Sequence, residues 1–195
     1  MGLSIYYSGS FNPSASLKDL IEEVVEIANV YQWKYNVFET NFPQGEFDEK
    51  YDEKIYGVTF TPPSSETFFL SFLSNGRMSS NTNLKFFGNS SDKENQSYLY
   101  MLSTKTQFCG MKTHMLIVHL LKYLSNKYLL TFQLTDDGQY WETGDEKLLE
   151  DTFKRYNDLL NSVSDALETF PVKTDETMEE YLSRLLDCVN KKRLM

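Results

Sequence analysis

The 195-residue sequence is poor in the residues that supply most metal and redox chemistry. It contains two cysteines, Cys109 and Cys188, and two histidines, His114 and His119. The cysteines form no C-x-x-C pair, so we expect reduced thiols and not the disulfide framework of a secreted domain. The histidines are five residues apart and would diverge on a helix, which excludes the paired ligands of a zinc protease. We therefore expect no metal ion and no cofactor.

The sequence also lacks a long apolar run and an excess of positive charge. No segment approaches the roughly 20 apolar residues of a membrane span, and the N-terminus does not resemble a signal peptide. Lys and Arg total 19 against 28 Asp and Glu, which gives a net charge of -9. Such a chain repels phosphate backbones. We expect a cytoplasmic protein that binds neither nucleic acid nor membrane.

Aromatic residues, in contrast, are abundant. The 14 Phe, 13 Tyr and 2 Trp supply large apolar surfaces and exclude an intrinsically disordered chain. A chain of this length buries enough surface to hold a core without disulfides or metals. We expect a single domain over residues 1–195, organised as 1–97, 98–142 and 143–195.

Four segments carry apolar residues at helical spacing: residues 17–31, 116–124, 145–170 and 178–189. In the third segment the apolar residues recur every 3.5 residues, namely Leu149, Phe153, Tyr156, Leu160, Val163, Leu167 and Phe170. Pro171 ends this helix, and Thr174 or Asp175 is expected to cap a last one. The sequence predicts a C-terminal helical pair in a monomer, with a homodimer through the 145–170 helix as the alternative.

Alternating apolar and polar residues predict strands over residues 3–7, 33–38, 55–61, 67–74, 98–108 and 128–135. In the last strand Leu130, Phe132 and Leu134 are expected to face inward. Asn75-Gly76 predicts a type I′ hairpin that returns the chain over residues 77–80. Residues 40–54 and 81–97 are polar and are expected to form surface loops.

The order strand, helix, strand occurs twice, beginning at Leu3 and at Leu102. The two units are either an internal duplication or independent copies of a common motif. We predict an α+β fold with a mixed, mostly antiparallel sheet, a βαβ-type repeat and helices on one face. The element order resembles that of TATA-binding-protein-like domains, which implies one saddle-shaped sheet covered by helices. Because no basic sheet face accompanies this order, the resemblance does not extend to DNA binding.

The segment that follows the last predicted strand combines acids with aromatics. It contains Asp136, Asp137, Tyr140, Trp141 and Glu142 and no basic residue. Turn and helix-capping roles account for several of the acids, but an acidic rim around aromatic anchors also fits a basic protein partner. We therefore expect a non-enzymatic binding protein, such as an immunity-type neutraliser of a basic toxin.

Two alternatives remain open. Cys109 precedes the second helix, whose N-terminus lowers thiol pKa values, and His114 follows one turn later, as in a cysteine-assisted hydrolase or transferase. The opposing interpretation is a buried structural thiol beside a surface or boundary histidine. The second alternative is a small-ligand-binding module that uses the sheet face opposite the helices.

Overall fold

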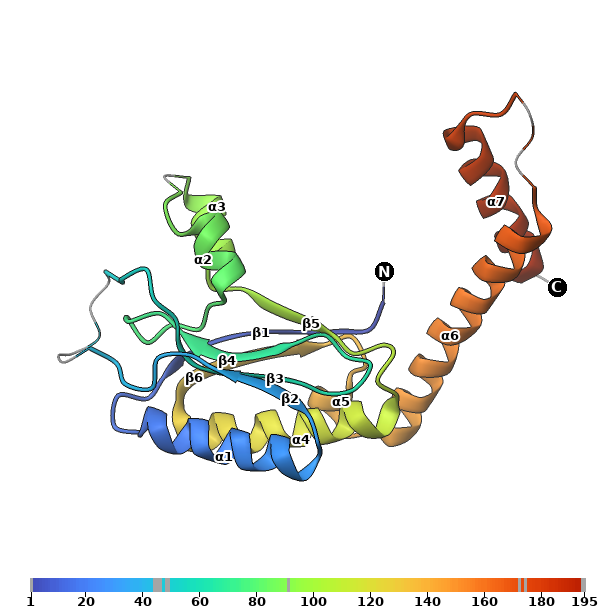
Figure 1. Cartoon of the computed structure of the whole chain (residues 1–195). Helices are drawn as coiled ribbons and strands as arrows, with labels where there is room; N and C mark the ends of the chain where they lie inside the picture. The colour runs from blue at the N-terminus through green and yellow to red at the C-terminus, as the bar shows by residue number, and fades with distance from the viewer. Residues whose placement is uncertain are drawn as a thin grey trace. The chain divides into compact units, whose positions relative to one another are not determined.

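The structure, a computed structural model, describes residues 2–43, 47, 50–90, 92–171, 173 and 175–193. The chain divides into two compact units, unit 1 (Met1–Leu149) and unit 2 (Glu150–Met195) (Figure 1). The expected organisation of residues 1–195 as one domain stays a prediction.

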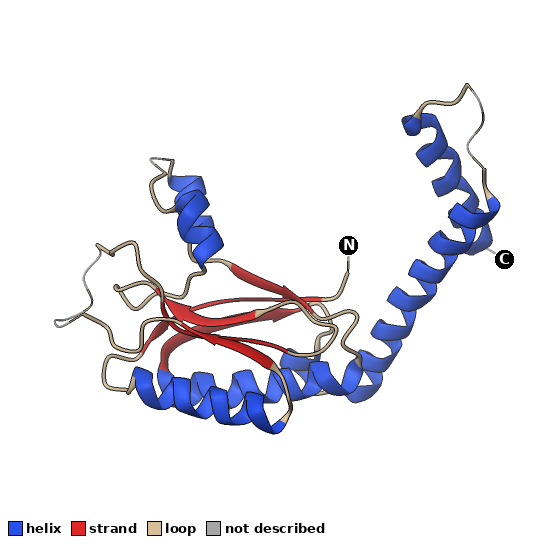
Figure 2. Cartoon of the chain, in the orientation of Figure 1, coloured by secondary structure: helices blue, strands red, loops and turns tan. Residues whose placement is uncertain are grey.

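Unit 1 combines short antiparallel strands with helices. Its strands are β1 (Ser4–Phe11), β2 (Lys34–Val37), β3 (Tyr56–Thr61), β4 (Phe68–Phe72), β5 (Leu102–Lys105) and β6 (Leu129–Asp136). Its helices are α1 (Leu17–Val30), α2 (Asn81–Phe87), α3 (Lys93–Tyr98), α4 (Met111–Tyr128) and α5 (Tyr140–Thr143). Helix α6 (Glu146–Thr169) begins in unit 1 and continues into unit 2, which also holds α7 (Met178–Arg193). This mixture of helices and strands confirms the α+β fold class (Figure 2).

The strands form two sheets in place of the single sheet that the element order implied. One sheet has the order β5-β1-β6 and the other β2-β3-β4, and every pairing in them is antiparallel. Residues 76–78 lie between the sheets, because Met78 N donates to Gly9 O and Phe72 forms a bridge with Met78. The expectation of one continuous sheet is therefore wrong.

The two strand–helix–strand units occupy different places in these sheets. In the first unit β1 and β2 belong to separate sheets, whereas in the second unit β5 and β6 both flank β1. An ancestral duplication stays a prediction that the topology does not confirm.

The core lies between the sheets and the helices α1 and α4, which run side by side (Figure 1). Helix α1 begins where Ser16 Oγ accepts the N–H of Asp19. A row of stacked rings connects the two sheets: Trp33 stacks on Phe60, Phe60 on Phe68, and Phe68 on Tyr7. Such rings supply large buried apolar areas that hold the sheets together.

The hairpin after β4 differs from the predicted type I′ turn. Gly76 N donates to Leu73 O and Leu73 N donates to Arg77 O, which closes a three-residue loop. In this loop Gly76 has a positive φ of 76° and Asn75 does not. The geometry is that of a hairpin whose glycine forms a bulge.

Residues 81–97 are not the predicted loop, because α2 and α3 occupy most of this segment. Helix α2 begins where Ser80 Oγ accepts the N–H of Asn83. Helix α3 runs to Tyr98, so β5 begins only at Leu102 and the strand predicted from residue 98 is too long.

Strand β6 also departs from its predicted pattern. Phe132 and Leu134 are half-buried, but Leu130 is 65% exposed and does not face the core. The reason is an irregularity in the pairing with β1 between Ser10 and Phe11, which shifts the alternation of side chains.

Unit 2 contains α6 from Glu150 onward and the whole of α7. Thr177, and not the predicted Asp175, caps α7, because Thr177 Oγ1 accepts the N–H of Glu180 and the Glu180 carboxylate accepts the N–H of Thr177. The other predicted cap, Thr174, lies outside the described residues. None of the helices in the described residues is both long and apolar enough to cross a membrane.

Candidate binding surface

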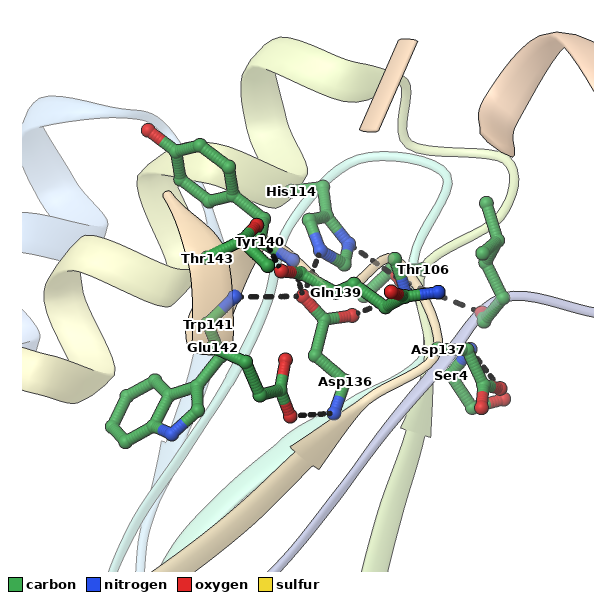
Figure 3. A network of polar contacts seen from close by, with 12 residues as sticks. Ser4, Thr106, His114, Asp136, Asp137, Gln139, Tyr140, Trp141, Glu142 and Thr143 are labelled. Carbon is green, nitrogen blue, oxygen red and sulfur yellow. Dashed lines mark hydrogen bonds and ion pairs between the residues drawn. The ribbon is translucent and has the colours of Figure 1, made fainter. Parts of the chain in front are cut away.

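Asp136 ends β6 and lies at the centre of a buried polar network (Figure 3). Its Oδ2 accepts hydrogen bonds from the backbone N–H groups of Tyr140 at 3.0 Å and Trp141 at 3.2 Å. Its Oδ1 accepts the N–H of Gly138 at 2.7 Å. The carboxylate therefore accepts hydrogen bonds from backbone N–H groups that would otherwise have no partner in the turn and at the start of the helix that follows.

His114, on α4, supplies a further partner. Its Nε2 lies 3.0 Å from Asp136 Oδ2, and its Nδ1 lies 2.9 Å from Thr106 Oγ1. Both side chains of the His114–Asp136 pair have an exposed fraction of 0%. The expectation of a surface or boundary histidine is wrong for His114, because it is buried at helical spacing with Ile117 and Leu121 in α4, which packs on β6.

The electrostatics of the pair follow from these contacts. Burial raises the pKa of Asp136, but the hydrogen bond and charge of His114 and the backbone N–H groups lower it further, so the net pKa lies below its usual value. Because a carboxylate only accepts hydrogen bonds, the His114 Nε2 atom carries a proton. The pair is thus a buried, hydrogen-bonded contact with a structural role.

The same contacts explain why residues 140–143 form a helix. The three backbone donors that Asp136 accepts all belong to the turn and the first residues of α5. Glu142 Oε1 accepts the N–H of Asp136 in return. Gln139, before the helix, and Gly144, after it, both adopt left-handed backbone conformations, which set its limits.

The structure divides the predicted partner-binding residues into two groups. Asp136 and Tyr140 are buried, with exposed fractions of 2% and 5%, and so are removed from any surface that a partner could touch. Asp137 is half-buried, and its carboxylate accepts the N–H of Ser4. Trp141 is half-buried and Glu142 is exposed, so these two residues remain accessible.

Trp141 lines a groove between α4 and β6. It packs edge-on against Phe132, with ring centroids 5.7 Å apart, and Lys122 Nζ lies 5.2 Å from its centroid. The groove has a volume of about 350 Å³ and includes the exposed Leu130. We call the residues Lys122, Leu130, Phe132, Trp141 and Glu142 the Trp141 surface.

The structure does not bring Cys109 and His114 together as a catalytic pair. Both ring nitrogens of His114 already contact Thr106 and Asp136, and Cys109 Sγ lies 3.6 Å from Gly110 O. Burial raises the pKa of the Cys109 thiol to about 11, so the thiolate is scarce at neutral pH. The side chain of Cys188 lies outside the described residues.

A larger cavity of about 700 Å³ lies elsewhere in unit 1. Phe38, Tyr51, Ile55 and Leu84 give it an apolar wall, and Glu39 and Lys54 are among its polar groups. Its volume falls within the range of small-molecule sites. No feature of the sequence marked this cavity, because its walls come from three separate segments of the chain, residues 38–39, 51–55 and 81–89.

In the part of the chain that the structure describes, no three His, Cys, Asp or Glu side chains are arranged to hold a metal ion. No family model matches the chain, and no curated protein and no solved structure matches it.

Proposed function

We propose that this chain is a non-enzymatic binding protein that recognises a basic protein partner through the Trp141 surface, in the manner of an immunity protein that neutralises a toxin. The observation that carries the proposal is the position of Trp141. Its backbone is tied to the buried Asp136 carboxylate, while part of its side chain lines an open groove.

A fixed aromatic side chain beside a groove has the properties of a binding hot spot. Tryptophan is enriched among the residues that dominate interface energies, especially where neighbouring side chains exclude water. The hydrogen bonds to Asp136 hold α5 in place before a partner arrives, so less conformational entropy is lost on binding. The exposed Leu130 extends the apolar area of the same groove.

The charges near this surface favour a basic partner. Glu142, Asp145 and Glu146 are exposed at α5 and the start of α6, and the whole chain carries a net charge of -9. Lys122 is a cation at the groove, but its Nζ lies over the Trp141 ring. Such a field accelerates encounter with a positively charged protein and weakens as salt is added.

Site-specific cross-linking tests the proposal. A photo-reactive amino acid is placed at position 126, which lines the groove and leaves Trp141 intact, and at position 26 on α1 as the control. We expect one basic protein to cross-link from position 126 but not from position 26, and the yield to fall with added salt. Absence of a cross-link from position 126, or an acidic partner there, would contradict the proposal.

A pair of matched variants then tests whether binding depends on where a negative charge lies or only on the net charge. Glu142→Gln removes one charge but keeps an oxygen that can accept the Asp136 N–H, and Glu26→Gln removes one exposed charge on α1. With the cross-linked partner purified, we expect Glu142→Gln to weaken binding about tenfold and Glu26→Gln to change it little. Equal effects of the two variants would show that only the net charge matters.

The 700 Å³ cavity supports a second candidate, a small-ligand-binding function. Apolar walls with a few charged groups are typical of such sites. Replacing Leu84 by Trp fills part of the cavity. If this function is correct, a compound that raises the unfolding temperature of the native chain in a thermal screen loses its effect in the variant.

A further inference from the structure

The two helices of unit 2 pack along one row of residues. Figure 2 shows α6 and α7 folding back on each other in opposite directions. The buried centre consists of Ala166 from α6 and Tyr181 and Leu185 from α7. Leu159, Val163 and Phe170 of α6 pack against it while partly exposed. This core is small for a pair of helices of 24 and 16 residues.

Four exposed leucines directly follow four of these packed residues. Leu160 follows Leu159, Leu167 follows Ala166, Leu182 follows Tyr181, and Leu186 follows Leu185. Their exposed fractions are 38%, 50%, 46% and 58%. We call Leu160, Leu167, Leu182 and Leu186 the leucine face.

Helix geometry places these leucines on the same side of the pair. Each residue of a helix is rotated by about 100° from the one before it. Viewed from one end, antiparallel helices wind in opposite senses. The residue after a core position therefore points to the same side on both helices. Met178, three residues before Tyr181 and 70% exposed, adjoins this side.

The other side of the pair is polar. The residues that precede the same core positions are Asp158, Asp165, Glu180 and Arg184. Unit 2 thus has one charged side and one apolar side that the described part of the chain leaves in contact with solvent. A contiguous exposed apolar patch of this kind is typical of an interaction surface.

We propose that the leucine face packs against the leucine face of a second copy of this chain and forms a four-helix bundle. A two-fold axis brings the same surface of each copy together, so an uncharged apolar face meets its own equivalent without charge repulsion. Ser164, which follows Val163 on this side, is also uncharged and small. The bundle supplies the larger core that two helices alone lack.

The size of the face is sufficient for a specific dimer. Helix α7 is about 24 Å long and two adjacent helices are about 20 Å wide, so the footprint is roughly 500 Å² per copy. The two copies together reach about 1,000 Å², the lower limit for a specific interface. This dimer differs from the predicted homodimer through residues 145–170 alone, because Val163 and Phe170 pack in the contact with α7 and both helices form the leucine face.

Sedimentation equilibrium of the full chain tests the proposal. We expect the native chain at micromolar concentration to have twice the 22.8 kDa monomer mass. The double variant Leu167→Gln/Leu186→Gln should raise the dimer dissociation constant at least about 100-fold, because the two-fold interface loses four leucines. The control Asp158→Gln/Asp165→Gln, on the polar side, should remain dimeric.

A further variant distinguishes loss of the dimer from loss of the fold. Ser164→Glu keeps every leucine and adds a charge to the same side, so it should also give a monomer with an unchanged helical circular dichroism spectrum. A native chain that sediments as a monomer would overturn the proposal, even if it bound vesicles or another protein. A dimer that survives both Leu167→Gln/Leu186→Gln and Ser164→Glu would equally overturn it.

Discussion

Replacing Asp136 by Asn tests whether the buried network holds α5 in place. The substitution keeps the size of the side chain but removes its charge and turns one acceptor oxygen into a donor. Asp136 accepts four hydrogen bonds, one from His114 and three from backbone N–H groups. The asparagine cannot accept all of them, so at least one buried donor loses its partner.

The expected cost is large. A buried donor left without an acceptor costs about 1 to 3 kcal/mol, and the loss of the charged acceptor weakens the hydrogen bonds that remain, so we expect Asp136→Asn to cost about 3 kcal/mol. Asp137→Asn is the matched control, because Asp137 is half-buried and accepts one hydrogen bond, from Ser4 N. We expect the control to cost about 1 kcal/mol or less.

Urea unfolding at neutral pH measures both values, and the fluorescence of Trp141 reports on α5. The chain has two tryptophans, so a Trp33→Phe background leaves Trp141 as the sole reporter. In that background Asp136→Asn should shift the emission to longer wavelength and increase quenching by acrylamide. His114→Gln should also lower the free energy of unfolding by less in the Asp136→Asn variant than in the native chain.

The free energy of unfolding should depend on pH in a defined direction. The folded-state pKa of Asp136 is lowered from 3.8, so its contribution to the free energy of unfolding is present above about pH 4 and is lost as the pH falls further. In Asp136→Asn the free energy of unfolding should fall less between neutral and acidic pH than it does in the native chain. Equal costs for Asp136→Asn and Asp137→Asn, with unchanged Trp141 emission, would refute the role assigned to the network.

Three further predictions concern single sites. Gly138→Ala should destabilise the fold by about 1 to 3 kcal/mol in urea unfolding, because its Cβ would lie 2.6 Å from Leu149 Cδ1. An unchanged midpoint would contradict that contact. In a Cys188→Ser background, Cys109 should react slowly with iodoacetamide at neutral pH and faster toward pH 11, since its thiol pKa is raised to about 11. Fast alkylation at pH 7 would contradict this and favour the cysteine-based alternative. Ser16→Ala should cost about 1 kcal/mol through loss of the α1 cap, whereas Ser16→Asp should cost little, as the two unfolding midpoints would show.

The helices with a strong apolar row could be predicted from the sequence. Helices α1, α4 and α6 lie where their periodicity indicated, because burial of one face selects that spacing. Helix α2 could not be predicted in the same way. It is short and has no buried residue, so its cap at Ser80 was the main signal in the sequence.

The candidate site was found only in part. The acids and aromatics after β6 stood out by composition, and Trp141 and Glu142 do lie at an accessible surface. The burial of Asp136 could not be foreseen, because its partner His114 is 22 residues earlier and meets it only through the packing of α4 on β6. Long-range pairing of this kind leaves no local pattern.

The proposed function requires that α5 is held in one position with part of the Trp141 ring accessible. Amide hydrogen exchange at Tyr140 and Trp141 measures this most directly, because both N–H groups donate to Asp136 Oδ2. We predict slow exchange in the native chain and exchange faster by several orders of magnitude in Asp136→Asn. Rapid exchange at both amides in the native chain would show that α5 is loose and would contradict the proposed role of Trp141 as a fixed anchor.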